Sequence, residues 1–265
     1  MNPDQVRLAI SLLAAHVVGD FVLQTDEGAR SKHRLPVLLG HCVAVALLSY
    51  ILTGLWLVWQ IPAAVLATHV VIDFVKARFL PAKPSSFLLD QLAHVLVIIA
   101  ISLLAPRIWP GVHGSFWQAA VGANFYAVLI LLTGFLTAVY AGTVLVGLFV
   151  EPFLRDLRRD ERTTDSADAE PATRRRKGFE EGGKVIGKLE RSMIFVLILA
   201  GQPSAIGFLI GAKSLFRFGE IGAGASRKEV EYIIIGTLMS FLVALVVSYL
   251  TRLALLGYQT GWSAT

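Results

Sequence analysis

The sequence predicts an all-α, polytopic membrane protein: a helical bundle of about six transmembrane helices plus one re-entrant helical hairpin. Only 16% of its 265 residues are charged, whereas a soluble domain carries about a quarter, and its mean hydropathy is +0.65. Several apolar runs reach the roughly 20 residues that cross a bilayer as a helix. A membrane β-barrel would show short alternating segments instead, and the sequence has none.

Composition divides the chain into four parts. Residues 1–105 form a predicted four-helix membrane domain, 106–150 contain one long transmembrane helix, 151–184 are a charged linker, and 185–265 hold the hairpin and a last helix. The predicted spans cover approximately residues 5–23, 36–59, 63–80, 87–105, 119–150 and 230–250. Two shorter apolar pieces, broken at Gly201-Gln202-Pro203, are each too short to cross, so we expect them to form the hairpin.

Basic residues predict the orientation of the helices. Lys and Arg are concentrated in the loops after the first, third and fifth spans, which places these loops and the linker in the cytoplasm and both termini outside. The net charge of +5 therefore reflects topology and does not indicate nucleic acid. The run Arg174-Arg175-Arg176-Lys177 is suited to anionic lipid headgroups, although positive-inside bias explains it equally well.

Two polar motifs repeat within the first domain. His16-Val-Val-Gly-Asp20-Phe-Val22 and His69-Val-Val-Ile-Asp73-Phe-Val75 match at six of seven positions and lie 53 residues apart. His41 and His94 have the same separation. The spacing predicts a parallel two-helix repeat, with a first copy at about residues 5–59 and a second at about 61–105.

The repeat collects ionisable residues at one depth, in the cytoplasmic half of the first four spans. His16/Asp20, His69/Asp73 and Asp90/His94 are i, i+4 pairs, so each pair shares one helical face. Charged groups within a membrane are costly and normally face the bundle interior. The expected cluster consists of His16, Asp20, His41, His69, Asp73, Asp90 and His94.

His and Asp on facing helices are typical of metal sites in bundle cores. Nitrogen and oxygen ligands without thiolate favour a divalent ion, zinc first and manganese or iron as alternatives. The predicted ligands are His16, Asp20, His41, His69, Asp73 and His94, with Asp90 as a ligand or general base. A proton relay and a purely structural polar network are the other interpretations. Cys42 is the only cysteine, and we interpret it as an apolar filler.

The polar positions resemble a known family. The pattern is His16-x3-Asp20-x3-Gln24, Lys32 before His41, His69-x3-Asp73-x2-Lys76, and Asp90-Gln91-x2-His94. It is similar, over about residues 8–104, to a bacterial and phage membrane-protein family catalogued as domain of unknown function 3307. The resemblance implies a place in the bacterial cytoplasmic (inner) membrane and no established activity. A more distant similarity to membrane-bound metal-dependent hydrolases with His-x3-Asp helices favours metal chemistry.

The leading hypothesis is a membrane-embedded, metal-dependent hydrolase of a lipid-like or phosphoester substrate. Asp90 and Lys76 would be its catalytic residues, with Lys76 holding an anionic group of the substrate. Lys213, Arg217 and Gln24 are further candidates for contacting that anion. The alternatives are a proton- or metal-coupled transporter that uses the same cluster, and a non-catalytic membrane adaptor that acts through the linker.

Overall fold

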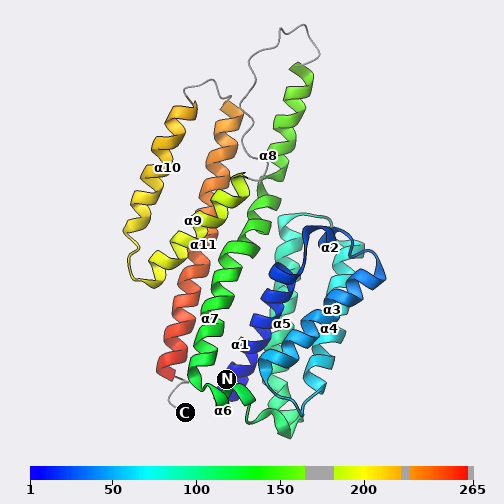
Figure 1. Ribbon diagram of the computed structural model, residues 1–265. Helices are drawn as coiled ribbons and strands as arrows, with labels where there is room; N and C mark the ends of the chain where they lie inside the picture. The colour runs from blue at the N-terminus through cyan, green and yellow to red at the C-terminus, as the bar shows by residue number, and fades with distance from the viewer. Residues whose placement is uncertain (165–181, 222–226, 262–265) are drawn as a thin grey trace. The chain divides into compact units, whose positions relative to one another are not determined.

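The computed structural model describes residues 1–164, 182–221 and 227–261, and every regular element in these ranges is a helix (Figure 1). Six described segments are long and apolar enough to cross a membrane: Pro3–Leu23, Leu35–Thr53, Gln60–Phe79, Pro84–Ile108, Ala123–Leu157 and Arg227–Gly261. The chain is therefore a multi-pass helical membrane protein, as predicted. The internal repeat, the orientation and the depth of the helices in the bilayer stay predictions.

The described chain divides into two compact units. The first comprises residues 1–137 together with the chain from Leu250 onward, and the second comprises Ala138–Tyr249. Elements of the first unit are α1 (Pro3–Val18), the π-helical turn η1 (Gly19–Leu23), α2 (Asp26–Arg30), α3 (Leu35–Thr53), α4 (Gln60–Phe79), α5 (Pro84–Ile108), the 3₁₀ turn η2 (Pro110–Val112), α6 (Phe116–Ala120) and α7 (Ala123–Leu136). Next along the chain come the π-helical turn η3 (Thr137–Ala141), α8 (Gly142–Thr164), α9 (Gly182–Leu199), α10 (Ala205–Ile221) and α11 (Arg227–Gly261).

Helix α1 organises the first unit, because it packs against α3, α5 and α7. Its start is capped on both sides: the Asn2 side chain accepts from the backbone N–H of Gln5, whose own side chain accepts from the N–H of Asn2. This capping box satisfies two amide donors that a helix start would otherwise leave unpaired. Residues of α1, α3, α4 and α5 with the following loops share one apolar core: Leu8, Leu12, Val45, Leu55, Val58, Ile61, Val65, Ile98, Ala105 and Val112.

Helix α3 ends six residues before its predicted end at Trp59. Gly54 follows it with φ +62°, a left-handed conformation that stops the helix and that glycine adopts without steric cost. The connection to the next span is therefore residues 54–59, and α4 already begins at Gln60. Pro62 lies in the first turn of α4. Backbone N–H groups in the first turn have no acceptor within the helix, so a proline, which lacks the N–H, costs no hydrogen bond there.

The long fifth span differs from its prediction at both ends. The chain forms the short helix α6 and then turns at Gly122, with φ +73°, so the span begins at Ala123 and not at about residue 119. At the other end α8 continues to Thr164, into the predicted linker. There Arg155 pairs with Glu151 at 3.0 Å, an i, i+4 contact that supports a solvated helix. The basic run at 174–177 lies outside the described residues.

Two helices separated by a tight turn occupy the predicted hairpin segment. Helix α9 ends at Leu199, Gly201 has φ +73°, and α10 begins at Ala205. The second unit has its own apolar core, formed by Ile194, Ile198, Ile206, Phe241 and Ala244. The last helix, α11, runs from Arg227 to Gly261, beyond the predicted range of 230–250 at both ends.

Candidate metal centre

Four helices of the first unit bring the predicted ligands together. His16 lies on α1 and Asp20 on η1, His41 lies on α3, His69 and Asp73 lie on α4, and Asp90 and His94 lie on α5. All seven side chains are at least nine-tenths buried, and the Asp73 side chain is fully buried. The acidic and imidazole groups thus converge inside the bundle, as the i, i+4 spacing predicted.

Two histidines and two aspartates form the tightest part of this cluster. The Nε2 atoms of His41 and His69 lie 3.2 Å apart, and both approach Asp20 Oδ1, at 3.2 and 3.3 Å. The same two nitrogens lie 3.6 Å from Asp73 Oδ2. We call these four residues the inner tetrad. One aspartate comes from each predicted repeat, and each contacts both histidines.

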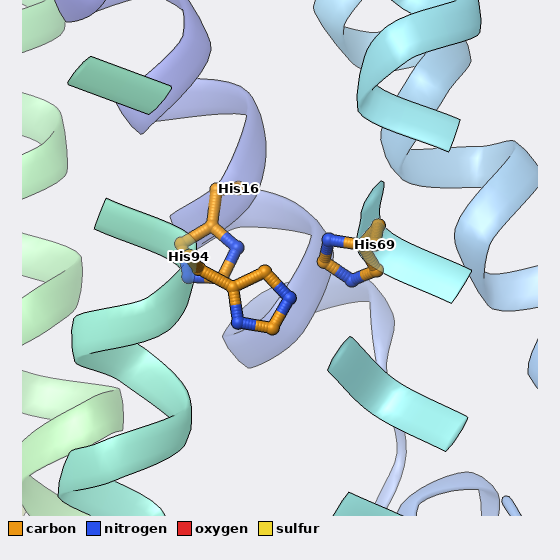
Figure 2. A group of neighbouring side chains, drawn as sticks. All are labelled: His16, His69 and His94. Atoms are coloured by element: carbon orange, nitrogen blue, oxygen red, sulfur yellow. The ribbon is translucent and has the colours of Figure 1, made fainter. Parts of the chain in front are cut away.

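The remaining residues lie beside the inner tetrad. Figure 2 shows the rings of His16, His69 and His94 gathered around one small space. The rings of His16 and His94 stack at 4.6 Å between centroids, and those of His69 and His94 lie at 4.3 Å. Gln91 Oε1 lies 3.2 Å from His16 Nε2 and accepts a hydrogen bond from it in the tautomer that carries the proton on Nε2. The Gln91 amide N–H donates to Asp90 at 3.0 Å.

Two lysines neutralise two of the three aspartates. Lys32 donates to Asp73 Oδ2 at 2.6 Å, and Lys76 donates to Asp90 Oδ2 at 2.5 Å. Lys32 is almost fully buried, whereas one third of the Lys76 side chain is exposed. Asp20 contacts only histidines among its described ion-pair partners.

Lys32 had no assigned role in the sequence-based prediction. It lies outside the spans, in the polar turn after η1, and only its place in the family pattern distinguished it from other loop cations. Cys42 was interpreted as filler, yet it is fully buried and its thiol lies within 4.8 Å of ligand atoms of His69 and Asp73. A single cysteine in an apolar helix carries no sequence signal for such a contact.

Several buried polar atoms of the cluster have no hydrogen-bond partner. They are His16 Nδ1, Asp73 Oδ1, Asp90 Oδ1 and His94 Nε2. An unpaired polar atom buried in a protein interior is costly, and such atoms commonly mark an ion or water. Among the described residues, four overlapping groups have ligand atoms close enough to hold a metal ion: His16/His69/His94, Asp20/His41/His69, Cys42/His69/Asp73 and Asp73/Asp90/His94.

The backbone around Gly19 brings Asp20 to the inner tetrad. The N–H of Gly19 faces the carbonyls of both Ala15 and His16, where α1 widens into the π-helical turn η1. Such turns commonly occur at functional sites. A Cβ atom on Gly19 would lie 2.6 Å from Val45 Cγ2, so glycine is what allows α1 and α3 to approach here.

The structure gives different surroundings for the other predicted site residues. Gln24 follows η1 as its C-cap residue and is half-buried. Lys213, in the second unit, donates to Glu190 at 2.6 Å. The side chain of Arg217 lies outside the described part of the chain. His33 is exposed, and the exposed His113 pairs with Asp4.

The fold and the cluster define a multi-pass membrane protein with a buried His/Asp centre. Residues 8–121 match the family described as Protein of unknown function (DUF3307), which confirms the resemblance drawn from the polar pattern. This range contains every residue of the cluster. No curated protein and no solved structure matched the chain.

Proposed function

We propose that this protein holds a divalent metal ion, zinc in the first place, on Asp20, His41 and His69 of the inner tetrad, and that the ion activates water to hydrolyse a lipid-like or phosphoester substrate. The centre would open towards the cytoplasmic side of the membrane. Manganese and iron suit the same nitrogen and oxygen ligands, so the donor set alone does not distinguish them from zinc.

The spacing of the inner tetrad is the observation that carries this proposal. Zinc binds histidine nitrogens and carboxylate oxygens at about 2.0–2.2 Å in a tetrahedron, whose ligand atoms are then about 3.3–3.6 Å apart. The three separations among Asp20 Oδ1, His41 Nε2 and His69 Nε2 are 3.2 to 3.3 Å, and Asp73 Oδ2 lies 3.6 Å from both nitrogens. Hydrogen bonds alone would explain these contacts poorly, because neutral His41 and His69 each have only one N–H to donate.

The charge of the cluster supports a cation. Three carboxylates face two lysine ammonium groups, which leaves one negative charge while the imidazoles are neutral. An uncompensated charge inside a membrane bundle is costly. Asp20 is the one aspartate of the cluster that has no lysine partner among the described residues. A divalent ion next to Asp20 would offset the remaining negative charge.

A small cavity beside the histidines supports water as the nucleophile. It has a volume of about 20 Å³ and is lined by His16, His69 and His94, by the hydroxyl residues Ser49 and Thr68, and by apolar residues. That volume holds about one water molecule. A catalytic zinc ion retains an open position for water and makes that water more acidic. Asp90, on the neighbouring helix, would accept the proton, and Lys76 would hold the anionic group of the substrate.

Metal analysis of the detergent-purified full chain tests the proposal. We expect about one zinc per chain in the wild type, and loss of that zinc in the double variant His69→Ala/Asp73→Ala. His33→Ala is the matched control, because it removes an exposed histidine outside the cluster. The absence of a stoichiometric divalent metal, or its retention in the double variant, would falsify the proposal.

A second measurement separates hydrolysis from transport. The metal-loaded protein would be assayed against phospholipid and phosphomonoester panels, and in parallel for zinc flux in liposomes. Hydrolysis that disappears in the double variant supports the enzyme. Zinc flux without hydrolysis would instead assign the same centre to a transporter.

A further inference from the structure

A second polar pocket lies at the opposite ends of the helices that carry the metal centre. It is lined by residues from the first turns of α1, the end of α3 and the segment after α5, and has a volume of about 120 Å³. One buried water needs only about 10–15 Å³, so the pocket has room for a small polar group. The lining residues used below are Asp4, Arg7, Ser11, Thr53, Ser115 and Gln118.

Hydrogen bonds to backbone carbonyls hold one wall of this pocket together. Ser115 donates to the carbonyl of Thr53 at 2.7 Å, and Trp117 donates to that of Ile51 at 2.6 Å. The N–H of Phe116 reaches the carbonyl of Gly54 at 3.0 Å. These bonds satisfy carbonyls that the end of α3 leaves open, and they hold α6 against α3.

Unsatisfied polar atoms face this pocket. Arg7 Nε, Ser11 Oγ and Gln118 Oε1 are buried and have no hydrogen-bond partner, and Ser11 is fully buried. The Arg7 side chain is 13% exposed; it makes a long contact, of 3.4 Å, with Asp4 and also interacts with the Tyr258 side chain. Two donors and one acceptor are therefore available to a ligand. Buried groups of this kind are normally paired.

The charges of the pocket are complementary to a zwitterion. Arg7 and Ser11 offer N–H and O–H donors for an oxyanion, whereas Asp4 and Gln118 offer oxygen acceptors for an ammonium group. Asp4 also accepts from His113 at 2.7 Å, and its side chain is 30% exposed. A ligand with two negative charges would be repelled by Asp4, so a phosphate joined to an ammonium group fits better.

The surroundings favour a position of the pocket at headgroup depth. Its residues stand at the ends of candidate spans, and the adjoining loops carry the exposed aromatic residues Trp56, Trp59 and Phe116. Aromatic side chains concentrate at the membrane–water interface. We infer that this pocket binds the headgroup of a zwitterionic, primary-amine phospholipid, with its phosphate on Arg7 and Ser11 and its ammonium group on Asp4 and Gln118.

Native mass spectrometry of the full chain in detergent tests this inference, with phosphatidylethanolamine, phosphatidylcholine and phosphatidylglycerol as probes. We expect phosphatidylethanolamine to bind most tightly, because phosphatidylcholine has no ammonium N–H and phosphatidylglycerol has no amine. Arg7→Gln should weaken that binding at least about tenfold, since it removes a charge-assisted hydrogen bond. Arg107→Gln, an exposed arginine at the end of α5, is the matched control and should bind like the wild type.

A second variant separates recognition from loss of folding. Asp4→Asn should keep the fold, as checked by circular dichroism, and should reverse the preference in favour of phosphatidylglycerol. Equal phosphatidylethanolamine binding by Arg7→Gln and wild type overturns the inference, as does an unchanged preference in Asp4→Asn. Displacement of the bound lipid by inorganic phosphate also overturns it, because the pocket would then be a site for the free anion.

Discussion

The ammonium group of Lys32 donates to Oδ2 of Asp73 at 2.6 Å, so a loop residue neutralises a fully buried carboxylate on the candidate membrane helix α4. This bond joins the polar turn after η1 to α4. A metal ion in the proposed centre would compete with Lys32 for the same oxygen, while Asp73 Oδ1 has no hydrogen-bond partner among the described residues. Under the proposal, Lys32 and the metal ion are alternative sources of positive charge for one carboxylate.

Replacement of Lys32 should therefore destabilise the metal-free protein more than the metal-loaded one. Lys32→Met leaves Asp73 buried without its cation, and removing one partner of a buried pair costs about 3 kcal/mol. A bound ion would offset part of this loss. Thermal unfolding with and without zinc measures the difference, and Lys83→Met, at an exposed lysine, is the control. The same destabilisation with and without zinc would contradict the proposed competition.

Lys76 should be needed for turnover and not for metal binding. Lys76 is one third exposed, but its partner Asp90 is fully buried, so Lys76→Met should cost about 1–3 kcal/mol of stability. Gln91 still donates to Asp90 in the variant. We expect unchanged zinc content and a loss of hydrolysis, measured side by side with Arg78→Met, an exposed cation two residues away. Zinc loss in Lys76→Met would show that this lysine supports the metal centre itself.

The close approach of α1 and α3 at Gly19 should control metal affinity. Gly19→Ala forces its new methyl group against Val45 Cγ2, which should cost about 1–3 kcal/mol and move Asp20 away from His41. Zinc titration should show weaker binding. Val45→Ala in the same chain should restore it, because the nearest remaining Val45 atom, Cβ, would lie at 3.5 Å. Gly40→Ala has open space and should bind zinc normally; weakened binding there would point to a general effect of helix substitution.

Arg191 should dominate the stability of the second unit. Its guanidinium group donates to Ser240 Oγ at 2.8 Å, to the carbonyl of Val139 at 3.2 Å and to Thr143 Oγ1 at 2.5 Å. Arg191→Ala should cost about 2–4 kcal/mol, and Arg191→Lys should recover little, because an ammonium group cannot make the same forked contacts. Ser240→Ala should cost about 1 kcal/mol. Chemical denaturation measures the unfolding free energy of each variant. Equal losses of unfolding free energy in Arg191→Ala and Ser240→Ala would contradict the dominant role of Arg191.

Much of the polar cluster could be predicted from spacing alone. Histidine and aspartate at i, i+4 must share a helical face, and their cost in lipid directs that face into the bundle. Helix ends were less predictable. The end of α3 at Gly54 depends on a left-handed glycine, and α8 continues through charged residues that hydropathy assigns to a linker.

The sequence by itself determined that this is a helical membrane protein and which residues share its polar level, because both follow from local periodicity and hydropathy. Only the tertiary structure decided which atoms meet. The inner tetrad, the Lys32–Asp73 bond and the Arg7 pocket each join residues that are distant along the chain. Such contacts depend on how helices cross and where a glycine lets them approach, and no single segment encodes that geometry.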